Sequence, residues 1–80
     1  MKYEYKGYEI SLEIEDCPTE WIVSASIDEV QNEVVVKKLH RIKEEFPRGE
    51  GAMNVGMYVQ KMAEKKIDDY IAAIQIGNQR

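Results

Sequence analysis

The chain has 80 residues, of which 44% are hydrophobic and 32% are charged, and its formal net charge at pH 7 is −4. A chain of this size forms one domain, residues 1–80, with a thin core. We expect no enzyme, because an enclosed active site would compete with that core for side chains. The acidic balance also argues against nucleic acid and anionic membranes as partners.

The charge is unevenly distributed along the chain. Residues 1–33 contain two basic and nine acidic side chains, whereas residues 34–80 contain nine basic and six acidic ones. The second part is therefore locally basic within an acidic protein.

Cysteine content and hydropathy predict a cytoplasmic location. Cys17 is the only cysteine, so no internal disulfide can form, whereas small secreted domains usually carry several. Residues 1–10 contain no apolar stretch that resembles a signal peptide. No apolar run approaches the roughly 20 residues that a membrane-spanning helix needs, so we expect no membrane partner.

Residues 3–15 predict a first β-strand, because apolar and polar side chains alternate along them. The apolar face consists of Tyr8, Ile10, Leu12 and Ile14. Lys6-Gly7 interrupts the alternation, either as a β-bulge or as a tight turn that makes residues 3–5 a separate short strand. Pro18 cannot donate a ladder hydrogen bond, so residues 16–19 predict a turn.

Residues 21–28 predict a second strand. Its apolar face consists of Trp21, Val23, Ala25 and Ile27, and the alternation is again that of a strand with one buried face. Residues 28–33 are polar and predict the loop of a hairpin.

Residues 34–46 admit two interpretations. Three consecutive valines favour a third strand, in which the apolar pattern slips between Val36 and Leu39 and requires a bulge near Lys37-Lys38. Such a strand would bring basic residues beside the acidic first strand, where cross-strand pairs help. The alternative is a helix over residues 33–46. This alternative is supported by the helical spacing of the apolar residues Val35, Leu39, Ile42 and Phe46. Asn32 would be the N-cap.

Residues 53–76 predict a long amphipathic helix after a glycine-containing loop at 47–51. Its apolar stripe consists of Val55, Val59, Ala63, Ile67, Tyr70, Ile71 and Ile74. Gly56 and Ala63 allow this helix to lie close to the sheet, and Gly77 fits the left-handed position that ends a helix. The predicted fold is α+β, a three- to four-stranded antiparallel sheet packed by one C-terminal helix, with a β-β-α-α order as the alternative.

The loop before this helix is a candidate anion site. Gly51 and Gly56 have the spacing of a phosphate-binding loop, but Met57 and Tyr58 stand where that motif needs Lys and Ser or Thr. The motif is therefore rejected. A weaker site remains, in which the free N–H groups of the helix start would hold a phosphate or carboxylate. Its residues are Arg48, Gly49 and Gly51.

A second candidate surface is the basic segment that contains Lys37, Lys38, Arg41 and Lys43. We interpret it as an interaction surface, and its lack of exposed aromatic residues argues against nucleic acid. His40 has no metal-ligand partners at suitable spacing, and the acidic residues beside Cys17 disfavour its thiolate. The pairs Glu44-Glu45 and Asp68-Asp69 predict solvated surface charge. We therefore predict no catalytic residue, no metal and no cofactor.

The order of features resembles small bacterial proteins of unknown function that consist of a β-meander and one helix. The features are Lys6-Gly7-Tyr8, Trp21, Phe46, Gly56 and Ile67-Asp68-Asp69-Tyr70. The resemblance implies a fold and no activity. We expect a non-enzymatic protein-interaction or self-associating module. The alternatives are an acidic inhibitor or immunity-type protein that binds a basic partner, and an anion or phosphate binder at the 48–56 loop.

Overall fold

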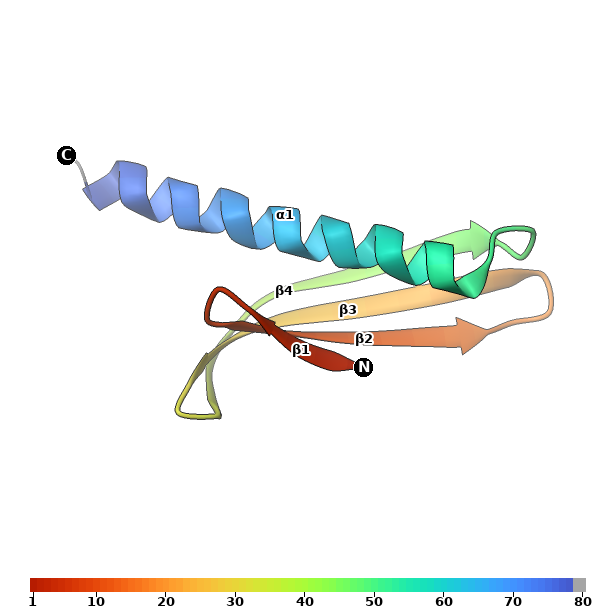
Figure 1. Cartoon of the computed structure of the whole chain (residues 1–80), viewed down its shortest axis with the longest axis horizontal. Coiled ribbons are helices and arrows are strands. Elements are labelled where there is room, and N and C mark those ends of the chain that lie inside the picture. The colour runs from red at the N-terminus through yellow and green to blue at the C-terminus, as the bar shows by residue number, and fades with distance from the viewer. Residues whose placement is uncertain (79–80) are drawn as a thin grey trace.

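The computed structural model describes the backbone of residues 1–78 and the side chains of residues 1–75. It contains β1 (Lys2–Tyr5), β2 (Tyr8–Asp16), β3 (Glu20–Gln31), β4 (Val34–Pro47) and α1 (Ala52–Asn78). The strands form one antiparallel sheet in the order β1-β2-β3-β4, and α1 runs along the sheet (Figure 1). The predicted α+β sheet with one C-terminal helix is confirmed.

Two tight turns connect the outer strand pairs. Lys6 and Gly7 have positive φ angles of 52° and 86°, and Asn32 and Glu33 have positive φ angles of 52° and 66°. Two residues with positive φ are the signature of a type I′ hairpin turn. Lys6-Gly7 is therefore the tight turn and not a bulge. The predicted loop at 28–33 is wrong, because a two-residue turn lets β3 continue through Gln31.

Residues 34–47 are a strand, so the alternative of a helix over 33–46 is wrong. β4 pairs with β3 along its whole length, and that pairing outweighs the helical spacing of a few apolar residues. The register shifts twice, which leaves Val36 and Leu39 without a partner on β3. These two bulges lie on either side of the predicted position at Lys37-Lys38.

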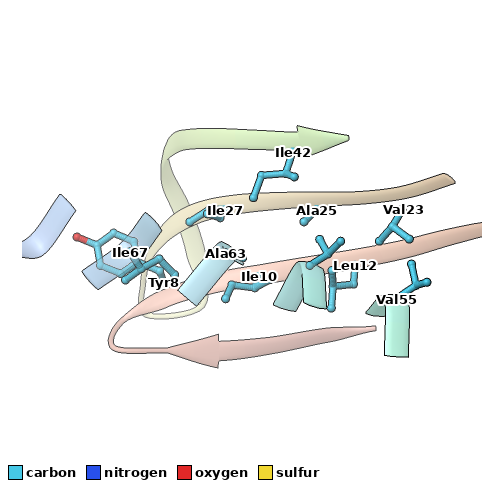
Figure 2. Close-up of a cluster of buried hydrophobic side chains, with 11 residues drawn as sticks. Tyr8, Ile10, Leu12, Val23, Ala25, Ile27, Ile42, Val55, Ala63 and Ile67 are labelled. Carbon is cyan, nitrogen blue, oxygen red and sulfur yellow. The ribbon is translucent and has the colours of Figure 1, made fainter. Parts of the chain in front are cut away.

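The core is a single layer between the sheet and α1 (Figure 2). On the helix, Val55, Val59, Ala63 and Ile67 are buried at intervals of four residues, which confirms the predicted stripe in this part. A Cβ atom at Gly56 would lie 3.3 Å from Ile14 Cδ1, so the helix approaches β2 closely there. The sheet contributes Tyr8, Ile10, Leu12, Val23, Ala25, Ile27 and Ile42.

The C-terminal part of α1 extends beyond the turn between β1 and β2 (Figure 1). Ile74 belongs to the predicted stripe but is 42% exposed, since the sheet ends before it. The helix also continues to Asn78, so the prediction that Gly77 ends it is wrong. One glycine in a last turn weakens a helix without stopping it.

Replacing Ala63 with Asp tests the phase of α1. Ala63 is 0% exposed, so Ala63→Asp would bury a carboxylate without a partner and cost roughly 3 kcal/mol or more. Ala72→Asp, at an exposed position of the same helix, is the matched control and should cost less than about 1 kcal/mol. Urea denaturation measures both values. Similar small losses in the two variants would contradict the helix phase.

The turn at Asn32-Glu33 provides a stabilising substitution. The φ of 66° at Glu33 is a conformation that glycine adopts without penalty. Glu33→Gly should therefore raise the free energy of unfolding by about 1 kcal/mol. Gly7→Ala is the converse at the matched turn position. Since a Cβ there meets no atom within 4 Å, its expected loss is purely conformational. Calorimetry that finds Glu33→Gly less stable than the parent would refute the turn assignment.

Candidate functional site

The sheet has one face against α1 and one face that no described element covers, which we call the open face. Its side chains alternate along each strand with those of the core. The open face consists of Lys2 and Glu4 from β1, Glu9, Ser11, Glu13 and Glu15 from β2, Ile22, Ser24, Ser26 and Asp28 from β3, and Lys38, Arg41, Lys43 and Glu45 from β4. It is the largest area of the sheet that remains accessible to a partner.

The open-face side chains of each strand form a row along that strand, which we call its column, and charge differs from column to column. The β2 column is acidic, the β3 column is rich in serine, and the β4 column is mostly basic. Glu13 pairs in register with Ser24, and Ser24 with Lys43. With strands about 4.8 Å apart, the acidic and basic columns lie roughly 10 Å from each other. That separation is close to the Debye length at about 0.1 M salt.

The expected charge pairs between the basic segment and the first acidic strand are therefore wrong, because β3 lies between them. Among the described residues, neither Arg41 nor Lys43 makes an ion pair. On the acidic side, Glu9 lies 3.9 Å from Lys2 Nζ. The charges of β4 thus remain free to meet a partner.

Small side chains along β3 make the centre of the open face concave. A shallow groove of about 360 Å³ runs over Ser24 and Ser26. Glu13 lies on one side of it, and Arg41 and Lys43 lie on the other. Long charged side chains can therefore rise on both sides of a polar floor. This shape suits contact with another polar surface.

Of the predicted interaction residues, the structure brings together Lys38, Arg41 and Lys43 and places Lys37 elsewhere. The unpaired Leu39 shifts the alternation of β4, so Lys38 pairs with Asp28 on the open face. Lys37 faces α1 instead, where its Nζ atom lies 6.0 Å from the centre of the Tyr70 ring. One bulge residue therefore decides which lysine joins the site.

The predicted anion-binding residues lie together in the loop between β4 and α1, but Arg48 is already engaged. Its guanidinium pairs with the Asp16 carboxylate, donates to the Cys17 carbonyl at 2.6 Å and stacks 4.5 Å from the Trp21 ring. The Gly51 carbonyl accepts the Val55 N–H at 3.0 Å and so begins the helix. Trp21 Nε1 donates a hydrogen bond to the carbonyl of Glu50 at 3.0 Å, which ties this loop to β3. The anion site remains a prediction.

His40 and Cys17 do not converge. Cys17 follows β2 and lies beside Glu20, the first residue of β3. His40 pairs with Ile27, seven residue positions farther along β3, or roughly 23 Å away. Burial raises the pKa of the Cys17 thiol, and the neighbouring Glu15 raises it further, so the thiolate is disfavoured as predicted. In residues 1–75, no three histidine, cysteine or acidic side chains gather as metal ligands.

A second polar cluster joins β1 to α1. The Tyr3 hydroxyl donates to Glu64 at 2.9 Å and the Tyr5 hydroxyl donates to Asp68 at 3.1 Å. Lys6 Nζ pairs with the same Asp68 carboxylate at 2.7 Å. The hydrogen bond from Lys6 lowers the pKa of Asp68, and the bond to Asp68 raises the pKa of Lys6. Burial, followed by the bond to Glu64, raises the pKa of Tyr3.

Sequence reasoning missed this cluster. It treated Asp68 as solvated charge, whereas the residue ties the first strand to the helix. The signal was present in the spacing, because Glu64 and Asp68 are one helical turn apart and the tyrosines alternate along a strand. The tyrosines also cover one edge of the core.

No protein-family model, curated protein or solved structure matches the chain. The resemblance to small bacterial β-meander proteins therefore remains a prediction. Within residues 1–78, no helix has the length and apolar character to cross a membrane.

Asp68→Asn should destabilise the fold in a pH-dependent way. The folded-state pKa of Asp68 is lowered, so its contribution is complete above the ordinary carboxyl pKa of about 3.9 and disappears as pH falls through the lowered value. Thermal unfolding at pH 6 should separate the variant from the parent. As pH falls below about 4, the difference between the two midpoints should shrink. Asp69→Asn, whose carboxylate pairs only with Lys65 within the helix, is the control, and a pH-independent deficit for Asp68→Asn would contradict the pairing.

Proposed function

We propose that the chain is a small non-enzymatic contact module that acts inside the cell and binds a second copy of itself through the open face. The observation that carries this proposal is the sorted charge of that face. Glu13 and Lys43 stand at the same level on opposite sides of Ser24, and Lys43 has no ion-pair partner in the described structure.

The order of the charged columns favours one orientation of the two-fold axis in a dimer. Dimers of identical chains usually have a two-fold axis. When two open faces meet, an axis parallel to β3 brings the acidic column of each copy over the basic column of the other. An axis across the strands brings like charges together instead. The first arrangement places Glu13 of each copy over Lys43 of its partner, and Glu9 over Lys38.

Other contacts limit the strength of this dimer. The same axis places Glu15 near the partner's Glu45 and Asp28 near the partner's Asp28, and both contacts are repulsive. The proposed contact covers three strands, β2 to β4, and the length of β3 from Ile22 to Asp28. With strands about 4.8 Å apart and about 3.3 Å per residue, its area is roughly 300 Å² on each copy. Stable complexes bury about 800 Å² per partner. The association is therefore weak and sensitive to salt.

Several observations support a module without catalytic chemistry. The open face carries serines and separated charges, and the nucleophilic candidate Cys17 lies in a turn with a raised thiol pKa. An intracellular location is part of the proposal, supported by a fold that holds together without a disulfide. The open face is not uniformly acidic, so it does not favour the alternative of an inhibitor for a basic partner.

Charge reversal tests the proposed contact. Sedimentation equilibrium at low salt and up to about 1 mM protein should show reversible association of the parent. Glu13→Lys alone and Lys43→Glu alone each turn two attractive contacts per dimer into repulsive ones, and each should weaken association roughly tenfold. The double variant Glu13→Lys/Lys43→Glu restores opposite charges and should recover most of that loss.

Lys61→Glu provides the matched control, because it changes net charge by the same amount as Lys43→Glu at an exposed position of α1. It should leave association within about twofold of the parent. A parent chain that stays monomeric at low salt and high concentration would refute self-association. If the single reversals leave association intact, or if the double variant does not recover it, the contact between copies does not lie on the open face.

A further inference from the structure

A groove lies on the opposite side of the molecule from the open face, between α1 and the β3–β4 hairpin. It has a volume of about 330 Å³. Its apolar part consists of Ile27, Leu39, Ile67 and Tyr70, and its polar part consists of His40, Lys66 and Asp69. Ile27 and Ile67 are 2% and 1% exposed, so the floor of the groove is continuous with the core. An apolar floor with a few polar groups at its rim is the usual form of a small-ligand site.

The backbone explains why the groove is open. The bulges at Val36 and Leu39 change the course of β4 beside it. Figure 1 shows the β3–β4 turn bending away from the C-terminal part of α1, while the helix continues past the β1–β2 turn. The two elements therefore diverge where the groove lies. Leu39, the residue that the bulge leaves unpaired, is part of its lining.

The rim of the groove has an excess of positive charge. Lys66 is exposed and makes no ion pair in residues 1–75. The carboxylate of Asp69 is already matched by Lys65, at 3.0 Å. Lys37 adds a second cation next to the groove, with its Nζ atom 6.0 Å from the centre of the Tyr70 ring, and its cross-strand partner Glu29 adds a carboxylate on the same side. Lys37, Lys65 and Lys66 together outnumber Glu29 and Asp69, so the excess charge that a ligand would meet is cationic.

We propose that this groove binds a small amphipathic anion, with an apolar body against Ile27, Leu39 and Ile67 and an anionic head beside Lys66 and Lys37. At roughly 30 Å³ per water-sized group, the volume accommodates about ten heavy atoms. A medium-chain carboxylate has this size and this separation of apolar and charged parts. The groove is separate from the open face, so the inference does not depend on self-association.

Three probes with eight-carbon chains and different head groups test the proposal: octanoate, octanol and octyltrimethylammonium. Each is titrated into the isotope-labelled chain while amide NMR shifts are followed, at a protein concentration where it is monomeric. Octanoate should saturate with shifts concentrated at Ile27, Leu39, His40, Lys66, Ile67 and Tyr70. Octanol should bind at least about fivefold more weakly and the cation more weakly still, because each loses or reverses the charge contact.

Two variants with equal net charge distinguish a contact at the rim of the groove from an effect of the overall charge of the protein. Lys66→Glu should weaken octanoate at least about fivefold, whereas Lys61→Glu, on the same helix outside the groove, should leave its affinity within about twofold. Leu39→Ala should weaken all three probes. Equal affinity for octanoate and the cation, equal effects of Lys66→Glu and Lys61→Glu, or no saturation up to about 10 mM would each overturn the proposal. The double variant Glu13→Lys/Lys43→Glu should bind octanoate like the parent, which keeps this test independent of the open face.

Discussion

The burial of one face of α1 against β2 and β3 is the constraint from which the rest of the structure follows. Residues at intervals of four on the helix meet the inward face of the sheet, and this contact is the only apolar layer in the described chain. A helix covers one side of a sheet, so the other side must tolerate water. The open face is therefore a direct consequence of a two-layer design in a chain of 80 residues.

The same constraint explains which elements were predictable. The period-2 alternation of the first two strands and the four-residue repeat of the helix are both imposed by burial on one side, and both can be read from residue order alone. The turn at Asn32-Glu33 was predicted as a longer loop, because Glu33 is an unusual residue for positive φ. Its conformation is imposed by the two strands that it joins. Helical spacing in residues 34–46 competed with strand pairing, and only the partner strand β3 could decide between them.

The candidate site was predictable in composition but not in arrangement. The sequence marks an acidic first strand and a basic third region, and the two faces of β2 and β3 follow from alternation. It does not reveal that β3 separates the charged columns, which turns expected internal pairs into an unpaired dipolar surface. Nor does it locate the bulge at Leu39. That single residue decides that Lys38, and not Lys37, lies on the open face, because a register change of one position reverses side-chain direction.

The bulges connect the two proposed surfaces through one physical cause. The free N–H and C=O groups of a long edge strand can pair with a strand of another molecule, and charged side chains and bulges commonly prevent this. β4 has both, so its edge is a poor template for another strand, and its face is the better surface for a partner. The distortion that protects the edge also bends the hairpin away from the overhanging end of α1 and leaves Leu39 unpaired beside Ile67 and Tyr70. A β4 without the bulge at Leu39 would exchange the two lysines between faces, and Leu39 would no longer be the unpaired residue beside the groove, so both surfaces depend on the same irregular strand.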